Sequence, residues 1–400
     1  MWKDRLSSLV TEFLAGHDPE VIGRTEFLRA RFDAGLAWIH HPVGLGGLDA
    51  PRELQPLVDG AFDAAGAPGS PPHRNPIGLG LAAPTILRHG TPALRKRLLR
   101  PLWTGEEIWC QLFSEPGAGS DLAAVATRAV RQTDGGSGAH TAGWIINGQK
   151  VWTSLAHRAR WGLLLARTDP DLPKHQGLSY FVCDMTAPGV EVRPLRQLTG
   201  DAEFNEVFLT DVRLPDELRL GEIGEGWQVA RTTLMNERVV IGGRPVPREG
   251  GMIGVLAEAW RNRPDRRTPA LHDELLRLWV RAEAVRLTGL LVRQQMVTGD
   301  PGPEGSAVKL SYAALTQAVS GLELDLLGVD GLRHDDWSLR RPDRVDMLGR
   351  TPGYRYLRAR GNSIEGGTSE ILRGIIAERL LGLPTEPRTD RNTAWKDLPR

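Results

Sequence analysis

The chain has 400 residues, 40% hydrophobic and 25% charged, so it is long enough for two or three globular units and is neither fibrous nor disordered. Lysine and arginine number 50 against 49 acidic residues, and this balance argues against a nucleic-acid or membrane-surface partner. Cys110 and Cys183 have no neighbouring cysteine to make a metal or redox pair, and neither a signal peptide nor a membrane-spanning run is evident, so we expect a cytoplasmic protein without a metal site.

Residues 1–107 are predicted to form a helical N-terminal domain. Apolar residues recur at helical spacing from Trp2 to Phe13. Thr91-Pro92 is typical of an N-cap followed by proline in the first helical turn. Thr104-Gly105 then closes the helical region.

Residues 108–222 are predicted to form a β-domain, because short apolar or alternating segments separated by turns replace the helical period. The segments are Val125–Val130, Gly143–Ile146, Lys150–Trp152, Trp161–Ala166, Leu178–Cys183, Val190–Val192 and Val207–Val212. Asn147-Gly148 between two of them predicts a tight hairpin, since both residue types tolerate positive φ. The absence of an intervening helix favours a closed or sandwiched antiparallel sheet.

Residues 223–383 are predicted to form a C-terminal helical bundle. The helical patterns run over Trp227–Ile241, Leu271–Val297, Ala307–Leu327 and Ser369–Leu381. The polar residues 384–400 are predicted to be a loose tail. The expected class is therefore α+β, with an all-α N-terminal domain, an antiparallel β middle domain and a C-terminal four-helix bundle.

The stretch from Trp109 to Asp121 joins a buried-strand pattern to a glycine-rich bend. A flat ring could lie along the end of such a strand, while a polar tail reaches Ser120, Asp121 and the backbone amides beside them. The same pattern also fits an ordinary strand-to-loop exit with a Pro-Gly turn.

Trp152-Thr153-Ser154 places an indole next to two hydroxyl groups. This combination suits an isoalloxazine ring, because the aromatic face shields the ring from water and a hydroxyl can donate near its N5 atom. A tryptophan in a strand also fits a plain core position.

Glu237 falls on the apolar stripe of a predicted helix, with Ala230, Leu234 and Ile241. A carboxylate placed there must be paired, protonated or functional, because an unpartnered charge in an apolar setting is costly. Desolvation would raise its pKa toward neutrality, as a general base for a carbon acid requires. A structural ion pair with a residue such as Arg238 is the alternative.

The stretch from Ile364 to Ile371 places two glycines and two hydroxyls at a predicted helix start. Free amides and the positive end of the helix dipole could hold a phosphate there. Simple capping by Thr368 or Ser369 is the alternative.

In this order, these stretches resemble the acyl-CoA dehydrogenase family over nearly the whole chain, from about Leu36 to Leu383. The segment Ser114–Asp121, Ser-Glu-Pro-Gly-Ala-Gly-Ser-Asp, is similar to the family's first signature, and Trp152-Thr153-Ser154 is similar to its flavin-contacting segment. The resemblance implies FAD held between the last two domains and α,β-dehydrogenation of an acyl-CoA thioester. It also implies a dimer or tetramer that passes electrons to an electron-transferring flavoprotein.

The resemblance implies roles for individual residues. Gln111, Phe113, Ser114, Trp152 and Ser154 would line the flavin, Thr368 and Glu370 would serve the FAD pyrophosphate, and Ser120 and Arg238 would serve the substrate.

The predicted base departs from the commonest family pattern. Many members carry a glutamate directly before Gly-Thr-Ser, but here Gly366 stands there and Glu365 is displaced by one. A subset that includes isovaleryl- and long-chain-type enzymes takes its base from the helix that holds Glu237. The resemblance therefore implies Glu237 as the base, Glu365 as the second candidate, and the amide of Gly366 as a donor to the thioester oxygen.

A second departure concerns FAD. The family's Arg and Phe-Gly contact is not evident, and its Gln-x-x-Gly-Gly-x-Gly appears as Asp325–Gly331. This departure leaves open a hetero-oligomer in which the chain is an FAD-binding or non-catalytic subunit. A flavin oxidase or monooxygenase of the same fold is another alternative, whereas the balanced charge disfavours a relative that binds DNA.

Overall fold

The computed structural model describes residues 1–70, 75–132, 143–242, 246–298, 302–334, 336–343, 346–387 and 390–399. The chain divides into two compact units. Unit 1 comprises Met1–Arg193, Phe204–Thr233 and Asp390–Arg400, and unit 2 comprises Pro194–Glu203 and Leu234–Thr389. The N-terminal helices and the sheet therefore share unit 1, and the division from unit 2 falls inside helix α6, Gly226–Gly242.

The first part of unit 1 is helical, as predicted. Its helices are α1 (Trp2–Gly16), α2 (Arg24–Asp33), α3 (Gln55–Ala64), α4 (Ala83–His89) and α5 (Pro92–Thr104). The hydroxyl of Thr91 accepts a hydrogen bond from the Leu94 amide at 3.3 Å, which confirms the predicted cap of α5. Gly105 ends that helix in the left-handed conformation, with φ +77°.

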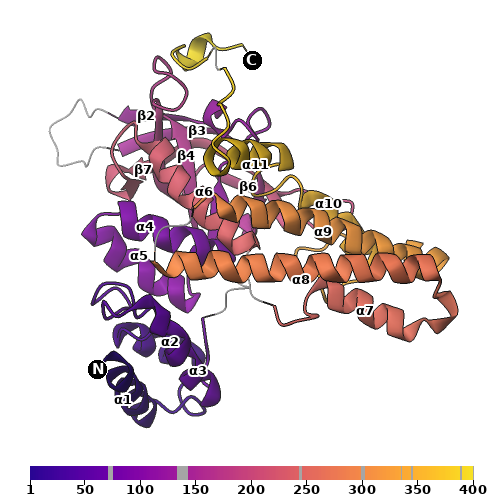
Figure 1. Ribbon diagram of the computed structural model, residues 1–400. Coiled ribbons are helices and arrows are strands. Elements are labelled where there is room, and N and C mark those ends of the chain that lie inside the picture. Colours follow the sequence, from indigo (N-terminus) through magenta and orange to yellow (C-terminus); the bar gives the residue numbers. More distant parts are fainter. Residues whose placement is uncertain are drawn as a thin grey trace. The chain divides into compact units, whose positions relative to one another are not determined.

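The second part of unit 1 is an eight-stranded, mainly antiparallel sheet with the order β6-β7-β3-β2-β4-β5-β8. Figure 1 labels five of its strands, β2, β3, β4, β6 and β7. The eighth strand, β1, pairs with β4 in parallel. The strands are β1 (Trp109–Leu112), β2 (Arg128–Gln132), β3 (Gly143–Ser154), β4 (Trp161–Arg167), β5 (Leu178–Asp184), β6 (Val190–Pro194), β7 (Phe204–Pro215) and β8 (Arg219–Leu220).

The prediction of a hairpin turn at Asn147-Gly148 is wrong. Strand β3 runs through both residues, and its register with β7 shifts between Ile146 and Gly148, so the pair forms an irregularity within one strand. The Asn147 side chain donates to Asp211 of β7 at 2.9 Å and accepts from the Asp211 amide at 2.9 Å. A long partner strand thus holds the two residues in the sheet.

Unit 2 is built around the long helix α9, which packs against α7, α8, α10 and α11. The helices are α7 (Met252–Asn262), α8 (Pro269–Thr298), α9 (Glu304–Leu327), α10 (Pro352–Gly361) and α11 (Ser369–Ile375), which continues into a π-helical turn, Ile376–Leu380. Figure 1 shows α8 and α9 side by side. The helical C-terminal region confirms the predicted class, although α7 and α10 were not among the predicted helices.

The C-terminal tail differs from the expectation of a loose segment. Residues 390–399 cluster with unit 1, and the backbone amide of Trp395 donates to Leu172 at 2.9 Å. The tryptophan at the centre of an otherwise polar tail supplies the apolar surface that a docked segment needs.

Candidate functional site

The two stretches of unit 1 assigned to the flavin lie side by side. The Val151 amide donates to the Ser114 carbonyl at 2.9 Å, and Lys150 Nζ donates to the Phe113 carbonyl at 3.0 Å. The end of β1 and the last residues of β3 therefore form one local structure.

Trp152 is placed differently from the core tryptophans of the sheet. It adopts a positive φ of 60°, its side chain is 57% exposed, and its ring contacts the Phe204 ring edge-to-face at 5.7 Å. The hydroxyl of Thr153 is buried and has no hydrogen-bond partner among the described residues. Two consecutive residues thus supply an exposed aromatic face and an unused donor, the two kinds of group that a flavin site needs.

The other predicted flavin and substrate residues of unit 1 differ in exposure. Gln111, Ser114 and Ser154 are half-buried. Phe113 is buried and contacts the Tyr180 ring edge-to-face at 5.8 Å. Its side chain therefore packs in the core, and its carbonyl accepts a hydrogen bond from Lys150. Ser120 is exposed on the glycine-rich bend.

A buried ion pair joins that bend to β3. Lys150 Nζ donates to Glu115 at 2.8 Å and to the Leu165 carbonyl at 2.9 Å, with no exposed surface. Glu115 also accepts from the amides of Ala126 and Thr127 at 2.6 and 2.9 Å. Burial alone would raise the pKa of Glu115, but the Lys150 charge and these hydrogen bonds hold it below its ordinary value.

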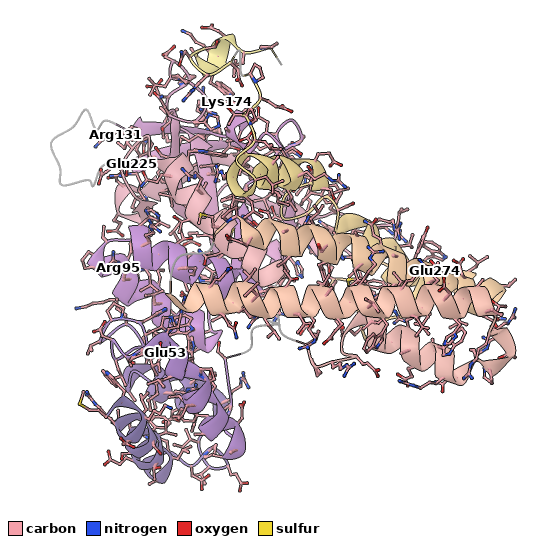
Figure 2. All side chains as sticks on the ribbon, viewed as in Figure 1. Glu53, Arg95, Arg131, Lys174, Glu225 and Glu274 are labelled. Atoms are coloured by element: carbon pink, nitrogen blue, oxygen red, sulfur yellow. The ribbon has the colours of Figure 1, made fainter. Side chains whose placement is uncertain are left out.

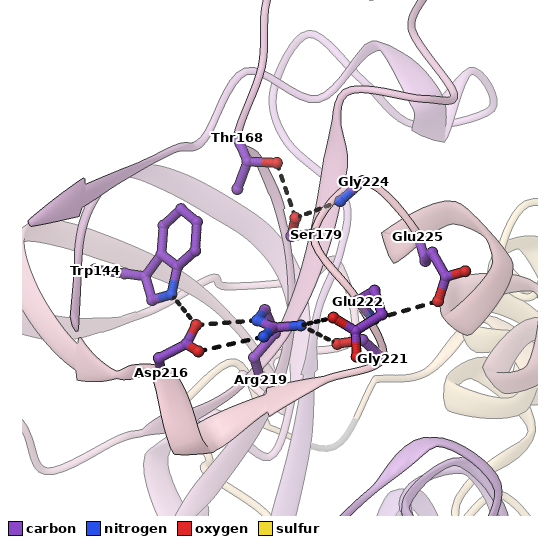
Figure 3. Close-up of polar contacts among 9 residues, drawn as sticks. All are labelled: Trp144, Thr168, Ser179, Asp216, Arg219, Gly221, Glu222, Gly224 and Glu225. Carbon is purple, nitrogen blue, oxygen red and sulfur yellow. Dashed lines mark hydrogen bonds and ion pairs between the residues drawn. The ribbon is translucent and has the colours of Figure 1, made fainter. Parts of the chain in front are cut away.

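Polar contacts fix the start of α6 to the sheet (Figure 3). The Gly224 amide donates to Ser179 Oγ at 3.1 Å, and the Ser179 hydroxyl is 2.8 Å from Thr168 Oγ1. The adjoining corner is held by Asp216, which accepts from Trp144 Nε1 at 2.7 Å and from Arg219 Nε at 3.0 Å. The first turns of α6 are therefore anchored before the helix reaches Glu237.

Glu237 continues the buried face of α6. Ala230 and Thr233 have no exposed surface, and the Thr233 hydroxyl lies 2.9 Å from the Tyr180 hydroxyl. One turn later on the same face, Glu237 is half-buried. The side chains of Arg238 and Ile241 lie outside the described residues.

The segment around Gly366 is held by α9 within unit 2. Gly366 and Gly367 both have positive φ, 65° and 97°, which explains the two glycines. Buried Lys309 donates to the Gly367 carbonyl at 2.6 Å. Thr368 caps α11 by accepting from the Ile371 amide at 3.3 Å, the alternative role considered for it, and Glu370 is exposed.

Glu365 is engaged by Arg358. The guanidinium donates to both carboxylate oxygens at 3.1 and 2.9 Å, and it also donates to Glu203 at 2.9 Å. Burial would lower the pKa of Arg358, but the two carboxylates raise it above its ordinary value. The arginine therefore stays charged and keeps Glu365 in a two-pronged ion pair.

Lys150 and Lys309 were not among the residues predicted for the site. A lysine within an apolar helical pattern, as between Val308 and Leu310, is the signal that could have indicated Lys309. Lys150 gives no comparable signal, because its partner Glu115 is 35 residues away.

Comparison with known proteins identifies the family. Residues 110–212 match the acyl-CoA dehydrogenase middle domain, and residues 224–381 match the acyl-CoA dehydrogenase C-terminal domain. Acyl-CoA dehydrogenase IpdE1 of Mycobacterium tuberculosis is 38% identical over 89% of this chain and 86% of that protein. The chain belongs to the acyl-CoA dehydrogenase family, whose members are FAD-dependent oxidoreductases acting on CH–CH groups.

Two further similarities bear on function. Acyl-CoA dehydrogenase FadE34 of Mycobacterium tuberculosis is 43% identical over 88% of this chain, but the match spans only 45% of that protein. The solved structure of the Tcur3481-Tcur3483 steroid ACAD has a TM-score of 0.70 and 25% identity, covering 96% of this chain and 97% of that one.

The residues present fit a flavin in unit 1, where Trp152 exposes its indole and the next residue, Thr153, has a buried hydroxyl without a hydrogen-bond partner among the described residues. Within the described ranges, no group of three or more His, Cys, Asp or Glu side chains could hold a metal ion. None of the described helices is long and apolar enough to cross a membrane.

Proposed function

We propose that the chain catalyses the FAD-dependent α,β-dehydrogenation of an acyl-CoA thioester to the trans-2-enoyl-CoA, with Glu237 as the base. The observation that carries the choice of base is the engagement of the second candidate, because Arg358 donates to both carboxylate oxygens of Glu365. Glu237 is half-buried and lies one turn after buried Thr233 on α6. A carboxylate held by a buried arginine is a poor proton acceptor.

Each proposed residue has one task. Glu237 removes the α-proton, and the amide of Gly366 donates to the thioester oxygen as negative charge develops there. Trp152 shields the flavin, Thr368 and Glu370 serve its pyrophosphate, and Ser120 holds the CoA portion. Bound FAD would supply the acceptor for the β-hydrogen, which leaves as hydride.

We further propose a cytoplasmic oligomer that uses an electron-transferring flavoprotein as acceptor. The free, buried thiols of Cys110 and Cys183 support a reducing compartment. The name of the Tcur3481-Tcur3483 steroid ACAD joins two proteins, which supports a hetero-oligomer and makes a steroid-derived acyl group a candidate substrate.

The test of the base compares Glu237→Gln with Glu365→Gln in anaerobic flavin reduction by a panel of short, branched and steroid-derived acyl-CoAs. We expect Glu237→Gln to retain flavin and lose about 100-fold or more in reduction rate, the usual contribution of a general base. Retained turnover in Glu237→Gln would rule out this base, and loss in Glu365→Gln alone would replace it.

The second candidate function is a non-catalytic subunit of a hetero-oligomeric dehydrogenase. Asp325 favours it, because an exposed carboxylate stands where the family has a glutamine in its FAD-binding motif. A purified chain that is colourless but becomes active when mixed with a second chain would support this function. Rapid reoxidation of the reduced flavin by oxygen would instead indicate an oxidase or monooxygenase.

A further inference from the structure

The C-terminal segment 390–399 pairs with a loop of unit 1. The backbone amides of Trp395 and Lys396 donate to the carbonyls of Leu172 and Pro170 at 2.9 and 3.1 Å. Pro173 and Ala394 form an antiparallel bridge. The segment therefore lies along residues 170–174 in a defined register.

The Trp395 side chain reaches the turn that follows the glycine-rich bend. Its Nε1 atom donates to the Ala124 carbonyl at 3.1 Å, and its ring lies 4.8 Å from the guanidinium carbon of Arg167. Arg167 is itself buried and donates to the Ala123 carbonyl at 2.5 Å and to the Lys174 carbonyl at 2.7 Å. One indole thus bridges the turn and the arginine that holds it.

Lys174 connects the bend directly to the tail, and Figure 2 shows it beside the C-terminal segment. Its ammonium group pairs with Asp121 at 2.7 Å and with Asp390 at 2.6 Å. Only 13% of the Lys174 side chain is exposed, so these contacts are screened less than those of a fully exposed lysine.

The bend needs such support. Pro116, Gly117, Gly119 and Ser120 are exposed, and a Cβ added at either glycine would meet nothing within 4 Å. Its first end is fixed by the buried Glu115–Lys150 pair. Its second end, at Asp121, is fixed from outside by Lys174.

We propose that residues 390–399 are a latch that holds the second end of the bend Ser114–Asp121 and thereby positions Ser120 for the CoA portion of the substrate. This inference rests on the proposed acyl-CoA function. Trp395, Lys174 and Asp390 are positioning residues, and the latch sets substrate affinity while the chemistry is left to other groups. Losing it lets the glycine-rich bend sample conformations that do not bind the substrate.

The test uses the full chain with Trp395→Ala, a variant ending at Pro387, and Arg391→Ala as the control. Arg391 is exposed and lies in the same segment. We expect faster amide hydrogen exchange over residues 114–125 in the first two variants and a rise in KM of about 5–10-fold. The kcat and the flavin content stay within about twofold of those of the parent chain, and the control changes neither exchange nor KM.

Trp395→Phe separates stacking from hydrogen bonding, and we expect it to recover part of the lost affinity. Unchanged exchange over 114–125 would overturn the latch, and so would faster exchange with an unchanged or lower KM. If the parent chain turns over no acyl-CoA, the proposed function is wrong. The hydrogen-exchange measurement would then still test whether residues 390–399 hold the bend.

Discussion

Lys150 brings a full charge to a position without solvent exposure, and its partners explain how the fold tolerates it. The ammonium group donates to Glu115 and to two carbonyls, and the carboxylate accepts two backbone amides. We predict that Lys150→Met lowers the free energy of unfolding by about 3–5 kcal/mol, because it leaves the Glu115 carboxylate buried without its partner charge. Urea titration measures the change.

Lys96→Met is the matched control, since Lys96 is exposed in α5, and we expect it to change stability by less than about 0.5 kcal/mol. The double variant Lys150→Met, Glu115→Gln recovers part of the loss, because no unpaired charge remains. Equal stability of Lys150→Met and the parent chain would show that the pair is not held as described.

A second pair, His40 and His41, makes stability depend on pH. Burial, with the nearby Arg52 charge, lowers the pKa of His40 to about 4, and burial with His40 and Arg52 lowers that of His41 to about 3. Both titrate near pH 6.5 when unfolded. Below that pH the unfolded state binds more protons, so stability falls as pH drops.

We expect a loss of about 2–3 kcal/mol between pH 7 and pH 5, with the share of His40 discounted for its partial exposure. His41→Asn should flatten this dependence in thermal melts recorded across that range. His272→Asn, at an exposed position, should leave the dependence unchanged. A parent chain whose melting temperature is flat over the range would contradict the burial of these rings.

Gly148 lies at the irregularity within strand β3, where the chain has no room for a side chain. A Cβ added to Gly148 would lie 2.3 Å from the Thr127 hydroxyl and 2.8 Å from its Cα. We predict that Gly148→Ala destabilises the chain by about 1–3 kcal/mol, since the neighbouring strand must move. The control is Gly60→Ala in α3, where an added Cβ would meet nothing within 4 Å. We expect it to stabilise the chain by up to about 1 kcal/mol. Urea titration measures both variants. If Gly148→Ala is as stable as the parent chain, the neighbouring strand can move at little energetic cost.

The same strand shows where prediction from sequence ends. Asn147-Gly148 has the local preferences of a hairpin turn and of a bulge alike, and the choice depends on Asp211, which is 64 residues away. Helix α10 escaped prediction because its buried face includes Arg355 and Arg358, which pair with Glu323 and Glu203. Those pairs replace the apolar stripe on which a helix prediction depends.

The residues proposed for the flavin and the substrate belong to local motifs. The Trp152-Thr153-Ser154 stretch and the bend at Ser114–Asp121 place their proposed residues in consecutive positions, so a local pattern could suggest both. The docking of Trp395 on Ala124 joins residues 271 positions apart, and no local pattern encodes it. The fold class and the family could therefore be predicted, whereas the supports of the site could not.

Helix α8 carries apolar side chains both on the side that faces the core and on an exposed side, and this affects how the whole molecule associates. One face contributes Leu275 and Leu278 to the core of unit 2. The other exposes Leu276, Val280, Leu287 and Leu291, with exposed fractions of 52%, 62%, 51% and 54%. Their spacing places these four side chains within about 60° around the helix, so they lie along one side of α8, with the Glu283–Arg286 ion pair between Val280 and Leu287.

An exposed apolar stripe of this kind is typical of a surface covered by another subunit. We predict that the double variant Val280→Lys, Leu287→Lys lowers the molar mass in light scattering from that of an oligomer to that of a single chain. The change places two ammonium groups where a subunit interface would have to desolvate them. Val21→Lys, at a position that is 79% exposed outside any helix, should leave the mass unchanged. An oligomer that survives the double variant with an unaltered mass would assign the subunit contact to another surface, and the stripe on α8 would then need a different occupant.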